Sequence, residues 1–334
     1  MRRFRIFIVF TVLVSVALAV SACGGSSGGG AQEVLDEATL EGVESGKFNL
    51  FGEFGPQRPG EGSLWFTFSG KFQSQKGKDL PELDLAADVK SLRNGEKTDF
   101  EGGITMLGDG EAYVAFDGTE YKVDPTTYGF VSSTLEESEE ASACQEVVSD
   151  RELSEFIEDP SEEDGVDMAG VSVTKVSGEI DGEAAVDALN EMRRDALCGE
   201  QLEAVLGMQP TLTELEESEG QAENPIEGAR IELFVDSDHI VRRIVLQAPS
   251  IEPPSSIVGG EGGSEIVKLE FDFTLTEVNE PQKITAPKDT KPLSALFVKL
   301  GVNPIELLGV LQGGIGGAGL TNFLERLAEA GSTQ

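Results

Sequence analysis

Apolar and polar residues alternate with a period of two in several separate segments, a pattern typical of β-strands with one buried and one solvated face. The alternation is clearest from Val267 to Leu275, where every second side chain is apolar. Asp117-Gly118 and Asp236-Ser237-Asp238 interrupt two of the segments, which predicts hairpin turns at both places. The predicted strands lie within residues 63–68, 82–90, 111–123, 171–180, 230–247 and 266–278.

Other segments carry the period of amphipathic helices. Residues 32–43 have an apolar stripe, and residues 136–148 and 151–157 are acidic with a helical pattern. Asp181 can cap a further helix that ends at Cys198. Residues 293–326 form a more apolar helical tail. Runs of strands with helices segregated between them predict an α+β fold built on one large antiparallel sheet.

The first 22 residues have the organisation of an export signal. Residues 1–5 hold three arginines and no acid, and the apolar stretch that follows is short for a membrane span. Val20-Ser21-Ala22-Cys23 then resembles the bacterial lipobox, whose cysteine receives diacylglycerol and becomes residue one after cleavage. We expect Cys23, with acyl chains such as palmitate, to anchor the protein at the outer face of the cell membrane. The alternative is an ordinary secretory signal in which Cys23 is incidental.

The chain carries 61 acidic and 25 basic residues, a formal net charge of −36. Loss of residues 1–22 removes three arginines and no acid, which brings the charge to −39. Such a field repels nucleic-acid phosphates and anionic lipid headgroups, so nucleic acid is excluded as a partner. Acid runs such as 136–140 and 162–164 indicate solvated loops or helix faces. Solubility explains the acidity more simply than an acidic binding patch.

Two cysteines, Cys144 and Cys198, remain after Cys23 is set aside as the anchor. An even number in an exported chain predicts a disulfide, worth roughly 4 kcal/mol in the chain-entropy model. The alternative is a pair of free, buried thiols.

Motifs for catalysis and metal binding are missing from the sequence. His239 is the only histidine and lies at a predicted turn, so neither a histidine-based triad nor a zinc site fits. Residues 314–319 match G-x-G-x-x-G, but only fifteen residues follow, too few to complete a dinucleotide-binding unit. A hinge between tail helices explains them better. Asp236-Ser237-Asp238 lacks the rest of a calcium loop. We therefore expect no enzyme activity, no metal and no cofactor.

Several of these segments, in this order, resemble a known family. A lipobox, a leading helix, amphipathic strands, "TKVSGEID" before a helix, "IELFVDSDHIVRRI" and a closing "ITAP" resemble the LppX/LprA/LprF/LprG group of mycobacterial envelope lipoproteins. The resemblance runs from about residue 32 to 287 and implies a strongly curved antiparallel sheet, with helices covering its concave face around an apolar cavity for acyl chains. Only Cys23 is carried over residue by residue. The acidity and the tail after Pro287 depart from the family.

The expected function is therefore that of an anchored lipoprotein that binds a lipid or glycolipid for transfer or presentation at the cell envelope. The alternative is an anchored scaffold or sensor with a solid core, which binds an envelope protein, because periodicity does not distinguish a cavity wall from a packed core. The residues expected to line the cavity share one face of the alternating strands: Leu64, Phe66, Phe68, Leu83, Leu85, Val114, Phe116, Leu269, Phe271 and Phe273.

The predicted organisation has four parts. They are a lipoprotein signal peptide (1–22), the lipidated cysteine with a Gly/Ser tether (23–32), a lipid-binding antiparallel-sheet domain (33–287) and a C-terminal helical tail (288–334).

Overall fold

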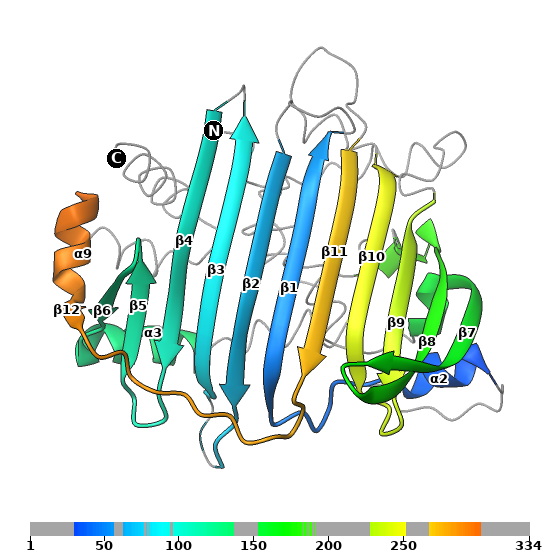
Figure 1. Ribbon diagram of the computed structural model, residues 1–334, viewed down its shortest axis with the longest axis horizontal. Coiled ribbons are helices and arrows are strands. Elements are labelled where there is room, and N and C mark those ends of the chain that lie inside the picture. The colour runs from blue at the N-terminus through cyan, green and yellow to red at the C-terminus, as the bar shows by residue number, and fades with distance from the viewer. Residues whose placement is uncertain are drawn as a thin grey trace. The chain divides into compact units, whose positions relative to one another are not determined.

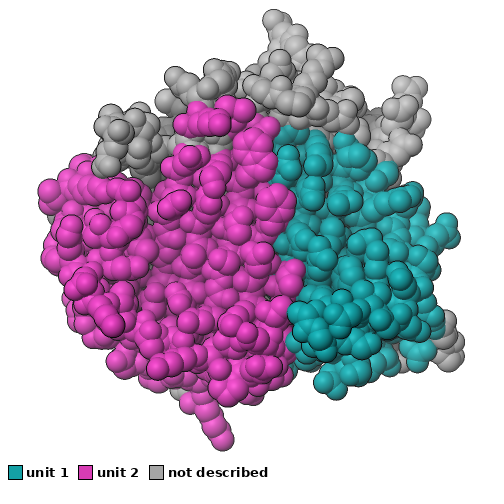
Figure 2. Space-filling model, in the orientation of Figure 1, with its two compact units in different colours: residues 1–42, 53–59, 140–273 teal, residues 43–52, 60–139, 274–334 magenta. Residues whose placement is uncertain are grey.

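The structure is a computed structural model that describes residues 30–56, 63–76, 78, 80–93, 96–136, 153–182, 184–185, 187–188, 191, 228–251 and 267–301. The chain divides into two compact units, coloured separately in Figure 2. Unit 1 contains residues 1–42, 53–59 and 140–273, and unit 2 contains residues 43–52, 60–139 and 274–334.

Twelve strands form one hydrogen-bonded sheet (Figure 1), in the order β12-β6-β5-β4-β3-β2-β1-β11-β10-β9-β8-β7. The last strand, β12, pairs in parallel with β6, so the sheet is mixed. The strands are β1 (Ser45–Pro56), β2 (Ser63–Gln73), β3 (Glu82–Arg93), β4 (Glu96–Met106), β5 (Ala112–Phe116), β6 (Thr119–Lys122), β7 (Ile157–Met168), β8 (Val171–Ile180), β9 (Arg230–Asp236), β10 (Val241–Ile251), β11 (Val267–Thr276) and β12 (Thr290–Pro292).

The predicted α+β class, with helices covering the concave face of an antiparallel sheet, is wrong. The described chain is mostly strand, in a single mixed sheet that does not close into a barrel. Within the described ranges, helix is limited to short pieces, namely α2 (Ala31–Glu37), α3 (Pro125–Glu136), α9 (Leu293–Leu300), the 3₁₀ helix η1 (Leu153–Phe156) and a few residues after Asp181. The sheet pairs segments that are distant in sequence, such as β12 with β6. Local periodicity cannot predict such pairings.

Strand β7 explains much of this error. Its sequence, IEDPSEEDGVDM, contains the acid run 162–164 that indicated a loop or a helix. As the last strand of the sheet, β7 pairs with β8 alone, so its side chains are mostly exposed and need no apolar alternation. An edge strand also tolerates Pro160. Positive φ angles at Asp159 and Gly165 accompany two register shifts, and such bulges protect an exposed edge.

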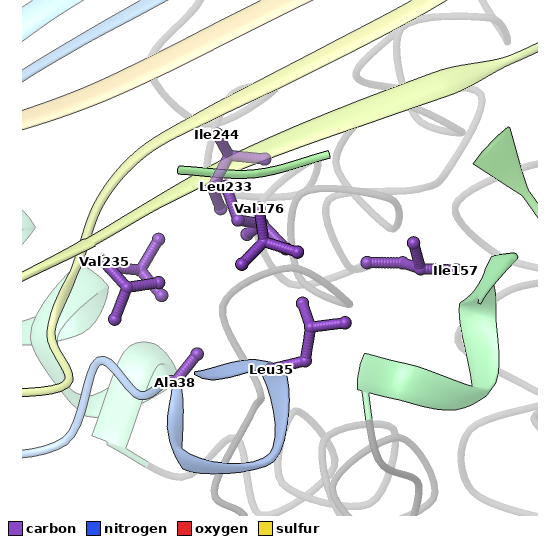
Figure 3. Packing of buried hydrophobic residues seen from close by; sticks show 8 residues of the cluster. Leu35, Ala38, Ile157, Val176, Leu233, Val235 and Ile244 are labelled. Carbon is purple, nitrogen blue, oxygen red and sulfur yellow. The ribbon is translucent and has the colours of Figure 1, made fainter. Parts of the chain in front are cut away.

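The core of unit 1 forms where α2 packs on strands β8, β9 and β10. Figure 3 shows Leu35 of α2, and Ala38 directly after it, pointing towards Val176, Leu233 and Ile244 of these strands. Leu35 and Val176 are fully buried. Two backbone hydrogen bonds, both 2.9 Å, hold the segment after α2 to the hairpin between β9 and β10. The Thr39 N–H donates to the His239 carbonyl, and the Val241 N–H donates to the Thr39 carbonyl. The helix predicted at residues 32–43 is thus confirmed, although it ends at Glu37.

Asp236 organises the hairpin between β9 and β10. Its Oδ1 accepts the N–H groups of Asp238 and Ile240, at 2.9 and 3.0 Å. Its Oδ2 lies 2.5 Å from Nε of Arg242, and the Asp236 side chain is only 3% exposed. The triplet Asp236-Ser237-Asp238 therefore forms a hairpin turn that is stabilised by the Asp236 side chain, as predicted. His239 takes the left-handed conformation in this turn, with φ of 62°.

Two aspartates begin helices. Asp181 accepts the Ala184 N–H at 3.0 Å, which confirms its predicted capping role. Asp124 caps α3, a helix that the sequence pattern did not predict, by accepting from the N–H groups of Thr126 and Thr127 and from the Thr127 hydroxyl. These hydrogen bonds, with that of the Thr127 hydroxyl first, lower the pKa of Asp124 below its ordinary value.

A strap of residues 277–289 in unit 2 connects β11 to β12. In Figure 1 it follows one end of the strands, drawn in orange. Asn279 accepts the Glu44 N–H at 2.8 Å and donates its own N–H to the Ser45 carbonyl at 2.8 Å, so the strap is fastened at the start of β1. Gln73 at the end of β2 accepts the Gln282 N–H at 3.0 Å. The strap thereby brings β12 to the free edge of β6.

Glycine positions within unit 2 allow close contacts between strands. A Cβ placed on Gly70 of β2 would lie 2.3 Å from the Asp84 carbonyl oxygen and 3.0 Å from Cζ of Phe48, whose ring covers the glycine. The backbone oxygen has no room to withdraw, because it belongs to the neighbouring strand β3.

We predict that Gly70→Ala destabilises the protein by about 1–3 kcal/mol through this overpacking. Gly129→Ala is the matched control, because a Cβ at Gly129 in α3 meets open space. Alanine is also a better helix former than glycine, so this change should raise the free energy of unfolding by about 0.5–1 kcal/mol. Urea unfolding of both variants measures the difference, and equal stabilities would contradict the predicted contact.

Candidate functional site

Strands β2 to β6 of unit 2 share one continuous apolar face. Residues directly opposite each other in paired strands point to the same side of a sheet, so the registers define the face. One row runs Phe68, Ala87, Gly102, Phe116, and a second runs Leu85, Ile104, Val114, Tyr121. The name apolar face is used for Leu64, Phe66, Phe68, Phe72, Leu83, Leu85, Ala87, Val89, Phe100, Ile104, Met106, Val114, Phe116 and Tyr121.

Seven of the ten residues predicted to line a cavity belong to this apolar face, and the registers place them side by side. They are Leu64, Phe66, Phe68, Leu83, Leu85, Val114 and Phe116. Phe66 and Phe116 are buried, and their rings lie against those of Phe68 and Phe100, with centroids 5.5 and 5.9 Å apart. Ile104 is 41% exposed, so the middle of the face is open to solvent.

The opposite face of the same strands is polar and ion-paired. Lys71 lies 3.4 Å from Asp84, and Lys90 lies 2.6 Å from Asp88. Glu111 accepts hydrogen bonds from Lys122 and from the Tyr113 hydroxyl, which lower the pKa of Glu111 and raise that of Tyr113. One side of these strands thus carries solvated ion pairs, and the other side carries apolar side chains.

Helix α9 covers the β5–β6 end of the apolar face. Leu293, Leu296, Phe297 and Leu300 are buried against Phe116, Tyr121 and their neighbours, among them Val114 and Phe100. Lys299 donates to Asp117 at 2.6 Å, and its ammonium lies 5.2 Å from the centre of the Phe116 ring. The Asp117 carboxylate raises the pKa of Lys299. By contrast, Val298 is 82% exposed.

The other three predicted lining residues, Leu269, Phe271 and Phe273, lie on β11 within unit 1. Leu269 and Phe271 are buried, at 6% and 4% exposure. Phe273 packs against the cluster under α2. Asp272 stands between Phe271 and Phe273 in the sequence and accepts two hydrogen bonds from Arg243, at 2.6 and 3.0 Å. These hydrogen bonds raise the pKa of Arg243. The described contacts of Phe273 are thus those of a packed core.

Unit 1 also encloses a small apolar cavity beside α2 and η1. It measures about 20 Å³, enough for one water molecule and far below the roughly 300 Å³ at which ligand pockets begin. Its lining includes Thr39, Leu40, Leu153, Ile231 and Leu233.

Three predicted sites lie outside the described residues, namely Cys23, Cys144 and Cys198. Within the described ranges, no group of three or more His, Cys, Asp and Glu side chains is placed to hold a metal ion. In that same part of the chain, no helix combines the length and the apolar character that a membrane span needs.

No family model matches the sequence, and no curated protein matches it. Among solved structures, the chain is similar to the crystal structure of LprF from Mycobacterium bovis, with 14% identity over 79% of this chain and 100% of that chain and a TM-score of 0.35. It is also similar to the Mycobacterium tuberculosis lipoprotein LppX, with 10% identity over 82% of this chain and 98% of that chain and a TM-score of 0.28. LprF and LppX both belong to the group that the sequence resembles, which agrees with the predicted resemblance.

Sequence reasoning missed about half of the apolar face. Phe72 continues the alternation of β2 and could have been found by extending that strand. Phe100, Ile104 and Met106 have the same period, but Gly102-Gly103 interrupts the pattern of β4. Helix α9 was predicted only as part of a tail, and no local signal shows that it packs on β5 and β6.

We predict that Phe297→Ala destabilises the protein by about 3–5 kcal/mol, because it removes a buried ring from the contact between α9 and the apolar face. Val298→Ala, at the neighbouring and exposed position, should change stability by no more than about 0.5 kcal/mol. Thermal unfolding of the two variants tests the contact, and equal losses would mean that α9 does not pack as described.

Proposed function

We propose that the protein is a lipoprotein, anchored at the outer face of the cell membrane through Cys23, that binds the acyl chains of a lipid or glycolipid. It would hold the lipid for transfer or presentation in the cell envelope, without catalysis. The observation that carries this proposal is the apolar face of unit 2, open at Ile104, in a chain with a net charge of −36. Water contact with such a face is unfavourable, and an apolar ligand removes it.

The dimensions of the apolar face suit an acyl chain. From Leu64 to Phe72 the face extends for about 26 Å along β2, and from β2 to β6 it is about 19 Å wide. Each methylene buried there contributes about 0.8 kcal/mol. The negative field disfavours anionic headgroups, so a neutral headgroup such as a sugar fits better than a phosphate.

A second candidate function is that of an anchored scaffold or sensor, whose apolar face binds an envelope protein. The packed contacts of Phe273 favour it, since this predicted lining residue lies against the buried cluster under α2. Binding of a protein would use the same exposed residues around Ile104, so the two candidates differ in whether lipid accompanies the purified protein. The disulfide between Cys144 and Cys198 remains part of the proposal.

We predict that Cys23→Ala releases the protein from membranes. Without the thiol no diacylglycerol can be attached, and the Gly/Ser tether offers no other apolar anchor. Cell fractionation and labelling with an alkyne fatty acid measure the effect, with Ser21→Thr as a control that keeps the cysteine. A Cys23→Ala protein that still takes up the label and sediments with membranes would exclude this anchor.

We predict that Ile104→Asp abolishes lipid co-purification. A carboxylate at the open part of the apolar face is unfavourable beside acyl chains, whereas stability should fall by no more than about 1 kcal/mol because the side chain is already 41% exposed. Ala86→Asp is the matched control, since Ala86 is exposed on the polar face of the adjacent strand β3. Native mass spectrometry of the chain from residue 23 onward, with Cys23→Ser, gives the lipid content. Lipid absent from every variant, the parent included, would favour the scaffold.

A further inference from the structure

Four lysines of unit 2 lie at one end of its strands. The strap passes this end, where Gln73 closes β2 and accepts the Gln282 N–H at 3.0 Å. Two of the lysines are on the strap, which Figure 1 shows along the ends of the strands, and two are in the turn between β2 and β3. The name lysine end is used for these four side chains, Lys76, Lys78, Lys283 and Lys288, all of them exposed.

The lysine end differs from most cations of the described chain, because its ammonium groups have no carboxylate partner. The cations with a carboxylate within 4 Å are Lys47, Lys71, Lys90, Lys122, Lys175, Lys268, Lys299, Arg230, Arg242 and Arg243. Within the described ranges no ion pair involves the lysine end, nor Lys97 and Lys291. Acids outnumber bases by 61 to 25, so a group of unpaired cations is unexpected in this chain.

The charge at the lysine end is locally positive. Residues 74–81 and 281–289 together hold four lysines and two aspartates, a local charge of +2 in a chain of −36. Glu277, earlier on the strap, is already bonded to Lys47 at 2.5 Å. Glu280 adds negative charge nearby and limits the attraction to anions. The rest of the acidic surface repels anions, so this end is the part of unit 2 that can approach an anionic surface.

The open part of the apolar face reaches the lysine end. Phe72, Leu83 and Met106 are opposite one another in the registers and form the last row of the apolar face before the strap. All three are half-buried. Ile104, two residues before Met106 on β4, is 41% exposed. An acyl chain that enters from this end therefore meets apolar side chains directly behind the lysines.

We infer that the lysine end docks on the anionic surface of a lipid bilayer and brings the apolar face to the lipids there. This docking rests on the proposed lipid-binding function. The anchor supports it, because β1 begins at this end, 22 residues after Cys23. An acidic protein could also pair with the lysines, but it would have no need of the apolar row beside them.

The high negative charge of the chain is compatible with such a contact. At physiological salt the Debye length is about 8 Å, whereas a strand as long as β2 extends for roughly 35 Å. Acids at the far end of the strands are therefore screened from the bilayer, and the charges at the lysine end decide the contact.

Sedimentation with vesicles tests the docking. The chain from residue 23 onward with Cys23→Ser, which lacks an acyl anchor, is mixed with vesicles of phosphatidylcholine, alone or with one-third phosphatidylglycerol. We expect binding to the anionic vesicles only, with loss of binding as salt is raised. Lys283→Glu and Lys288→Glu should each weaken binding at least fivefold, the usual effect of one lysine near an anionic membrane. Lys97→Glu is the matched control, because it makes the same charge change near the opposite end of β4 and should leave binding within twofold.

An equal loss in Lys97→Glu would overturn the docking, since net charge would then decide binding. No binding of the parent chain to either kind of vesicle would also overturn it, and an acidic protein would become the expected partner. Native mass spectrometry of the same chains keeps the proposed function separate. Lipid in a purified chain that binds no vesicles would refute the docking alone, whereas vesicle binding by a chain that never carries lipid would refute the proposed function alone.

Discussion

The register between β2, β3 and β4 is the constraint on which the rest of unit 2 depends. Phe66 opposite Val89, and Val89 opposite Phe100, put apolar side chains on one side, while Lys90 opposite Asp99 puts charge on the other. A slip of one residue in any pair would reverse the two faces of that strand. Gly70 helps to hold the register, because only a residue without Cβ fits beside the Asp84 carbonyl oxygen.

The acidity of the chain is compatible with this arrangement because most charges avoid the apolar face. On β2 to β6 the carboxylates other than Glu96 lie on the polar side, and several of them are beside lysines. On β7 they line the exposed edge of the sheet, where like-charge repulsion and two bulges disfavour pairing with a second molecule. The charge thus acts as protection against association in a protein that exposes apolar residues.

Sequence patterns recovered the elements that depend on neighbours within a few residues. The hairpins at Asp117 and Asp236, the cap at Asp181 and the alternation of β2, β3 and β11 all follow from local chemistry. Strand β7 was not predicted, because an edge strand needs no apolar side. Its acidic residues are more typical of a helix or a loop than of a strand. The place of β11 in the strand order, next to β1, was not predicted either, since alternation shows which residues share a side of one strand and does not show which strands are neighbours.

The fastening of the strap at β1 has a consequence for folding. Asn279 bonds to Glu44 and Ser45 across a sequence separation of about 235 residues, so the start of β1 is completed only after nearly the whole chain is available. Contacts between such distant residues form slowly, because a long loop must close first. A chain that folds as it is synthesised would therefore leave β1 partly unpaired until β11 and the strap have been made.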